Sequence, residues 1–305
     1  MRLNEEVKVL LLVGLGLGCF EGLSRQFETR LSADLRQIRS HEEIPEKIAK
    51  AKQEGRESVL VLGNSLARAG LREPEIRERF AASGKPDPEV LYLTPDASDV
   101  SDWTAAYRRL FHGRNESPEP NYVLVGTGRN HLEDRRVVSP EKLGAYHAGR
   151  SDFGRILRTW LGTTDERARF LIASVSSLFA NRERLRPILF YKVVPGYESV
   201  ARRLNEGDPA KWLPTAPKNA SAERFDLLLD SIRLPAERVM VAAIPLPWLY
   251  DLSPTLIEAA DKREVRVFTG ESDRVWPKEA FPDGYHLAPD GGASFTRSVM
   301  ARLLP

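Results

Sequence analysis

The sequence contains very little cysteine and carries almost no net charge. Cys19 is the single cysteine among 305 residues, so no disulfide can form within the chain and no multi-cysteine metal site is possible. Lysine and arginine total 45 against 43 aspartate and glutamate, which gives a net charge of +2. Such a balance provides no long-range positive field, and we therefore expect no nucleic-acid partner.

Histidine is also scarce, with five in the chain. His41, His112, His131 and His147 show none of the spacings typical of metal ligands. The glycines of the N-terminal apolar run are not followed by the Lys-Ser or Lys-Thr pair of a phosphate-binding loop. We therefore expect no metal ion and no bound cofactor.

One uncharged apolar run, residues 9–20 (VLLLVGLGLGCF), stands near the N-terminus. It is shorter than the roughly 20 residues that cross a bilayer straight, but it fits the apolar core of a signal sequence. Glu5 and Glu6 dilute the positive charge in front of it, and no small-x-small cleavage site follows. The sequence predicts that residues 1–23 form an export signal or an uncleaved membrane anchor. The alternative is a buried strand or helix of the globular fold.

The rest of the chain divides into a charged segment and an α/β fold. Residues 24–57 are strongly charged with few turn signals, which predicts one or two solvated helices that act as a spacer. From residue 58 onward, short apolar runs alternate with helical stretches, which indicates an α/β sandwich around a central, mainly parallel sheet over 58–305. The expected strands are 58–62, 89–93, 122–125, 239–244 and 264–268, and the expected helices are 65–82, 102–111, 254–262 and 292–304.

Residues 140–235 interrupt this alternation. They are rich in arginine, leucine, alanine and glutamate, with prolines at intervals. We interpret them as a helical insertion that forms a lid or a wall facing the substrate. The alternative is a set of longer connecting helices.

Polar residues follow three of the expected strands. Ser65 follows the first strand and Asn130 the third, while Asp283 and His286 lie between the last strand and the closing helix. Ligands of open parallel sheets bind beyond the carboxyl ends of the strands. We therefore expect these four residues to meet at one edge of the sheet.

The same four residues have complementary chemistry. A serine hydroxyl needs a base to take its proton, and an aspartate three residues before a histidine can hold the imidazole through Nδ1, leaving the other nitrogen for Ser65. The Asn130 amide and the backbone N–H of Ser65 can stabilise an oxyanion. Alternatively, Ser65 is an ordinary helix cap and Asn130 an ordinary turn residue.

These residues lie in motifs that resemble those of the SGNH (GDSL-like) hydrolases. Ser65 stands in Gly-Asn-Ser after an apolar strand, Asn130 in Gly-Arg-Asn, and His286 closes Asp-Gly-Tyr-His. The resemblance covers roughly residues 57–305 and implies a three-layer, flavodoxin-like sandwich. It also implies a serine hydrolase that acts on oxygen esters through a Ser-His-Asp triad. In anchored members it implies removal or transfer of acyl groups on a cell-surface glycan, at the membrane or outside the cytoplasm.

The sequence departs from the family pattern in two places. The family's second block has a glycine whose N–H completes the oxyanion hole, but the corresponding stretch here, LTPDASD, has none. Ala97 or Ser98 can offer a backbone N–H instead, whereas an inward-pointing Asp96 or Asp99 would oppose an oxyanion. His131 stands where the family often has aspartate, and we interpret it as a structural or substrate contact.

One alternative fold and one alternative function share parts of this pattern. Gly-Asn-Ser-Leu-Ala resembles the nucleophile elbow of α/β-hydrolases, but that fold places several strands before its serine and its acid far from its histidine.

The alternative function is a non-catalytic SGNH-like component that binds or assembles an envelope polysaccharide. The missing glycine supports it, and the intact Ser65, Asp283 and His286 oppose it. Trp248 and Trp276 are the candidates for stacking on a sugar.

Overall fold

The protein folds around one five-stranded parallel sheet. The computed structural model describes residues 4–31, 33–113, 117–185, 194, 196, 221–269 and 275–304. The strand order is β2-β1-β3-β4-β5, and every pairing is parallel. The strands are β1 (Ser58–Leu62), β2 (Glu89–Leu93), β3 (Tyr122–Thr127), β4 (Val239–Ala243) and β5 (Arg266–Phe268). The expected α/β fold with a parallel sheet is therefore confirmed.

The central strands are buried along their whole length, as expected where both faces of a parallel sheet are covered. Leu62 pairs with Leu93 on one side and Val125 on the other, so the carboxyl ends of β1, β2 and β3 lie at the same edge. β3 is two residues longer than predicted because its last residues continue the ladder with β4. β5 begins later than predicted because Glu264 has a left-handed φ of 57°, which extended strands exclude.

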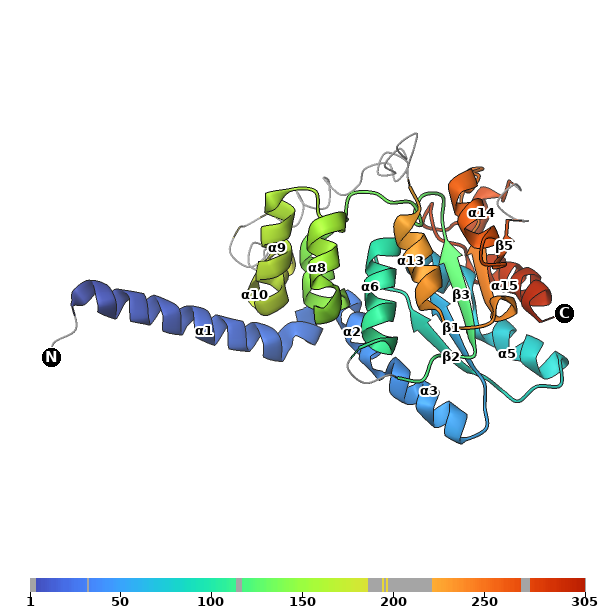
Figure 1. The fold of residues 1–305 in the computed structure, drawn as a ribbon, viewed down its shortest axis with the longest axis horizontal. Coiled ribbons are helices and arrows are strands. Elements are labelled where there is room, and N and C mark those ends of the chain that lie inside the picture. Colours follow the sequence, from blue (N-terminus) through green and yellow to red (C-terminus); the bar gives the residue numbers. More distant parts are fainter. Residues whose placement is uncertain are drawn as a thin grey trace.

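Helices pack on both sides of the sheet (Figure 1). On one side lie α4 (Ser65–Gly70), α5 (Glu73–Ala82) and α15 (Pro289–Leu303), which contact one another. On the other side lie α3 (Ile44–Gln53), α6 (Val100–Phe111) and α13 (Glu223–Ser231), and α14 (Pro254–Asp261) contacts α13 and β5.

The single helix predicted over 65–82 is wrong, because two helices occupy this range. The first ends at Gly70, Leu71 and Arg72 are extended, and Pro74 lies in the first turn of the second helix. Proline has no N–H to donate and its ring clashes with the preceding turn, so it begins a helix more readily than it continues one.

The described residues between β3 and β4 form helices and loops. They include α7 (Pro140–Lys142), α8 (Phe153–Arg155), α9 (Thr164–Val175) and α10 (Ser177–Ala180), connected through the short helical turns η2 (Leu143–His147), η3 (Arg150–Asp152) and η4 (Ile156–Trp160). These elements have their own small core, which includes Leu143, Ile156 and Phe170. The insertion predicted over 140–235 also includes residues 197–220, which lie outside the described part of the chain.

The N-terminal apolar run belongs to one long helix, α1 (Glu5–Leu31), which extends away from the sheet (Figure 1). Its apolar side chains are exposed, with Leu10 at 70% and Leu12 at 68%, so the run does not lie in the core. The helix is long and apolar enough to cross a membrane, and a signal sequence has the same properties. The helix continues through residue 23, so no break separates the apolar segment from the charged residues that follow it. After α1, the chain passes through α2 (Ala33–Ser40) and η1 (His41–Glu43) to α3.

The charged half of α1 is bound to the insertion. Glu21 accepts hydrogen bonds from Ser176 Oγ (2.8 Å), Ser177 N (2.8 Å) and Leu178 N (3.0 Å) at the start of α10. Burial alone would raise the pKa of Glu21, but the bonds from Arg25 and from α10 lower it to about 2.

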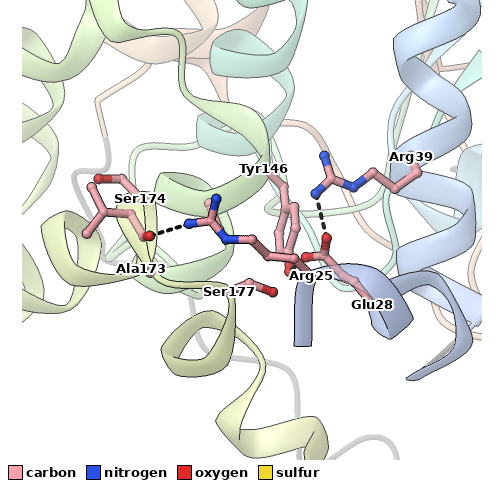
Figure 2. Close-up of a pocket in the computed structure, with 9 residues that line it drawn as sticks. Arg25, Glu28, Arg39, Tyr146, Ala173, Ser174 and Ser177 are labelled. Carbon is pink, nitrogen blue, oxygen red and sulfur yellow. Dashed lines mark hydrogen bonds and ion pairs between the residues drawn. The ribbon is translucent and has the colours of Figure 1, made fainter. Parts of the chain in front are cut away.

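A cavity of about 260 Å³ lies at this junction (Figure 2). Beside it, Arg25 donates to the Val175 carbonyl at 2.7 Å, and Glu28 accepts from Arg39 and from the Tyr146 hydroxyl. Burial would raise the pKa of Glu28, and the bonds from Arg39 and Tyr146 lower it. The polar contacts therefore fix the direction of α1 relative to α9 and α10.

The contact between α4 and β3 leaves no space for a side chain at Gly126. A Cβ atom there would lie 2.6 Å from Ala67 Cβ and 3.0 Å from Ala67 Cα. We expect Gly126→Ala to lower the free energy of unfolding by about 1–3 kcal/mol, because either the helix or the strand must shift. Chemical denaturation of the purified full-length protein in detergent measures this.

The matched control is Gly22→Ala in α1, where an added Cβ meets nothing within 4 Å. This change should leave stability unchanged or raise it by up to about 1 kcal/mol, since alanine favours a helix. Equal effects of the two substitutions would contradict the packing described for Gly126.

Candidate active site

Ser65 is the first residue of α4 and directly follows the turn that leaves β1. Asn64, and not Ser65, caps the helix: its Oδ1 accepts from Leu66 N at 3.0 Å. Asn64 Nδ2 donates to the Ser98 carbonyl at 3.1 Å, which ties this turn to the loop that follows β2. The alternative interpretation of Ser65 as an ordinary cap is therefore wrong, and its hydroxyl is available for another partner.

The partner of Ser65 is His286. His286 Nε2 lies 2.9 Å from Ser65 Oγ, and His286 Nδ1 lies 2.6 Å from Asp283 Oδ2. Asp283 Oδ1 also accepts from the backbone N–H groups of Tyr285 (2.9 Å) and His286 (2.8 Å). The turn that permits these bonds passes through Gly284, whose φ of 78° is left-handed. Two residues at the C-terminal end of the chain are thus brought to a serine more than 200 positions earlier.

The carboxyl group of Asp283 is held in its charged form. Burial alone would raise the pKa of Asp283, but the hydrogen bonds from His286 and Tyr285 lower it below the usual value. A charged carboxylate fixes the proton of the ring on Nδ1 and stabilises the imidazolium that forms when Nε2 accepts a proton. Asp283 and His286 are partly exposed, at 56% and 32%, so the site opens to solvent.

Ser65 and Asn130 line one cavity of about 250 Å³, which is slightly below the range typical of ligand pockets. It lies where the strand order reverses between β1 and β3, the usual ligand position in sheets of this order. The cavity is lined by Asn64, Ser65, Ala97, Ser98, Asp99, Arg129, Asn130, His131, Arg135, Val138, Leu246 and Tyr285. The structure therefore brings Asn130 to the same cavity as Ser65.

The loop after β2 contains an unusual backbone conformation at Ala97. Ala97 has a φ of 47°, in the left-handed region that favours glycine. Within the described residues, the backbone N–H groups of Ala97 and Ser98 have no acceptor. As the first residue of a helix, Ser65 also has an N–H without an intrahelical acceptor. Three donors are thus available around the cavity.

The two acidic residues of this loop have separate partners. Asp96 is 39% exposed and forms an ion pair with Arg68 at 2.5 Å, so it does not point into the cavity. Asp99 lines the cavity, but its Oδ1 accepts from Ser101 N (2.9 Å) as the cap of α6. Burial raises the pKa of the Asp99 carboxyl, which reduces the negative charge that it brings to the site.

His131 lines the cavity as a neutral ring. It stacks on Trp103 with a centroid distance of 6.3 Å, and desolvation lowers its pKa to about 4. Its carbonyl accepts from Val100 N at 2.8 Å, which joins the loops after β2 and β3. These contacts agree with the expected structural role.

The sequence did not identify Tyr285 or Arg135 as residues of the cavity. Neither Trp248 nor Trp276, the expected sugar-stacking residues, belongs to its lining; Trp248 packs behind Tyr285 at 6.1 Å, and Trp276 is 9% exposed. Tyr285 lies at a position that the motif does not specify, so the sequence identified Asp283 and His286 but not Tyr285. Within the described ranges, no cluster of three or more histidine, cysteine or acidic side chains is arranged to hold a metal ion.

The conformation of Ala97 gives a testable consequence. We expect Ala97→Gly to raise the free energy of unfolding by up to about 1 kcal/mol, because a left-handed residue with a Cβ costs about 1–2 kcal/mol and the added chain entropy offsets only part of this. Ala81→Gly, on the exposed face of α5, is the matched control and should lower stability by about 0.5–1 kcal/mol. A loss of stability in both variants would contradict the assigned conformation.

Comparisons with known proteins add no assignment to this geometry. No protein-family model matches the chain, and no curated protein matches it either.

Proposed function

We propose that this protein is a serine hydrolase of the SGNH type that acts on oxygen esters. The observation that carries the proposal is the continuous hydrogen-bond chain from Asp283 through His286 to Ser65. A serine that only supports the fold does not require a histidine held by a charged carboxylate. A nucleophilic serine requires both, because the histidine takes its proton and the carboxylate orients the histidine.

In the proposed reaction, Ser65 Oγ attacks the ester carbonyl while His286 Nε2 takes its proton. Asp283 stabilises the resulting imidazolium. The tetrahedral intermediate then expels the alcohol, which receives the proton from His286, and the acyl group remains on Ser65. Water or a sugar hydroxyl attacks the carbonyl of this acyl-enzyme and gives its proton to His286. The bond to Ser65 Oγ then breaks, His286 returns the proton to Oγ, and the acid or the new ester leaves.

The charge on the carbonyl oxygen needs donors in the cavity. The candidates are the Asn130 side chain and the N–H groups of Ser65 and Ala97 or Ser98, and each well-placed donor contributes a few kcal/mol to the rate. The loop lacks the glycine of the family's second block, and the N–H of the left-handed Ala97 is a candidate for the same role.

The strand order and the two groups of helices support the three-layer, flavodoxin-like arrangement that the SGNH resemblance implies. That resemblance also suggests a glycan ester at a cell surface as the substrate, with either hydrolysis or acyl transfer as the outcome. No cofactor is needed for this chemistry.

The second candidate function is a non-catalytic component that binds an envelope polysaccharide. The observation that favours it is that the loop after β2 lacks the glycine of the family's second block. Reaction with a covalent serine probe separates the two candidates.

We expect a fluorophosphonate probe to label the protein at Ser65. Ser65→Ala should abolish labelling, and His286→Ala should slow it by about 10⁴-fold because the hydroxyl loses its base. Gel fluorescence of full-length protein in detergent, with ester hydrolysis measured in parallel, checks both.

Ser294→Ala on the exposed face of α15 is the matched control and should label like the wild type. Folded wild-type protein that shows no Ser65-dependent labelling or hydrolysis would reject the hydrolase and leave the binding component.

We also propose that the apolar half of α1 anchors the protein in a membrane and that the site acts outside the cytoplasm. We expect the intact chain to sediment with membranes and to resist extraction by salt, and a chain without residues 1–20 to become soluble. This deletion keeps Glu21, which binds α10, so the fold should survive. Fractionation with detection of labelled Ser65 measures both location and folding. Soluble intact chain would contradict the anchor.

A further inference from the structure

The cavity beside Ser65 carries a surplus of positive charge. Three of its lining residues are charged in their ordinary states: Asp99, Arg129 and Arg135. Asp99 caps the N-terminus of α6, and Arg129, which also lines the cavity, is exposed. The proposed reaction uses neither arginine, so their presence needs another explanation.

The backbone at Arg135 is firmly held. Asp134 accepts from the N–H groups of Glu223 (2.8 Å) and Arg224 (3.1 Å), and the Arg135 carbonyl accepts from Arg224 Nη1 at 2.6 Å. These bonds fasten the loop after β3 to the start of α13. The side chain of Arg135 therefore projects from a fixed point.

The guanidinium of Arg135 donates no hydrogen bond within the described part of the chain. Its Nε is buried without a hydrogen-bond acceptor, and no carboxylate of the described residues lies within ion-pair distance. Two acidic groups, Asp99 and Glu133, interact with Arg135 through longer-range electrostatics, but neither accepts a hydrogen bond from it: Asp99 Oδ1 caps α6, and Glu133 bonds to Ser253. A buried N–H without an acceptor loses its hydrogen bond to water and gains none in return, so an acceptor on a ligand would relieve this unfavourable arrangement.

Arg224, at the start of α13, is a neighbouring arginine with a structural role. It is 8% exposed and donates to Ser101 Oγ at 2.7 Å, while its Nε lies 3.7 Å from Asp134. Its guanidinium is satisfied within the fold, and that of Arg135 is not. The contrast indicates that Arg135 serves a ligand.

We propose that Arg135 binds an oxyanion of the substrate, so that the ester cleaved at Ser65 belongs to an acidic sugar or a similar small anionic unit. This inference rests on the proposed hydrolase. A guanidinium binds carboxylate or phosphate through two parallel hydrogen bonds. The small cavity places the anion and the ester on one compact unit, with the Tyr285 ring as part of the wall.

The test compares acetate release from three mono-acetylated probes: a methyl glucuronoside, glucose 6-phosphate and a methyl glucoside. We expect kcat/KM to be at least about 10-fold higher for one of the two anionic probes than for the neutral one. Arg135→Gln should lower kcat/KM for the preferred anionic probe by at least about 10-fold more than for the neutral probe, and Arg135→Lys should keep part of the preference because lysine retains the charge.

Arg136→Gln is the matched control. Arg136 is its neighbour, is 73% exposed and pairs with Glu166 away from the cavity, so the same loss of charge should leave the preference intact. Thermal melting of each variant verifies that it is folded. Equal rates on the acidic and neutral probes, unaffected by Arg135→Gln, would overturn the anion site while leaving the hydrolase in place.

Binding of unacetylated methyl glucuronoside and glucose 6-phosphate to Ser65→Ala, measured by calorimetry, separates the two proposals. Binding that Arg135→Gln abolishes and that weakens with salt supports the anion site even where no ester is cleaved, in which case the hydrolase alone fails. Absence of both binding and preference overturns the anion site.

Discussion

The close contact of α4 with β3 sets the position of Ser65, and the rest of the site is arranged around it. Gly63 and Gly126 both lack the side chain that would hold the helix away: a Cβ at Gly63 would lie 2.5 Å from the Gly126 carbonyl. The first turn of α4 therefore lies directly against the end of β3. Because β1, β2 and β3 end at the same edge, the loops that carry Ala97 and Asn130 meet that turn.

A second contact explains how His286 reaches the serine from the other end of the chain. Thr296 of α15 donates to the Gly70 carbonyl (2.9 Å) and accepts from Arg72 N (2.8 Å), so α15 is fastened to the end of α4. Gly292 permits the approach, because a Cβ there would lie 2.4 Å from a carbonyl of α4. The helix that follows His286 is thus joined to the helix that carries Ser65, and a disturbance of either should separate the two side chains.

The sequence predicted most where local chemistry decides the structure. β1 and β2 have their predicted bounds because short buried runs end at turn residues, and Asp283 and His286 lie within one turn. It failed where the deciding partner is distant or the conformation is unusual. Nothing in the sequence reveals that Ala97 is left-handed, and Arg135 lies in the run Glu-Asp-Arg-Arg, which is typical of a solvated surface. The binding of α1 to α10 joins segments more than 150 residues apart, which periodicity cannot reveal.

The continuity of α1 has a consequence for how a substrate is met. A flexible linker between an apolar segment and a folded unit lets a site explore a large volume, and its effective concentration then depends on linker length. Here one helix runs from the exposed apolar residues to the carboxylates of Glu21 and Glu28, both bonded to the fold. A surface that binds the apolar end of α1 therefore sets the distance and the orientation of the Ser65 cavity relative to that surface. For the proposed hydrolase, esters presented at that height would meet Ser65 at a higher effective concentration than esters presented nearer to or farther from the surface.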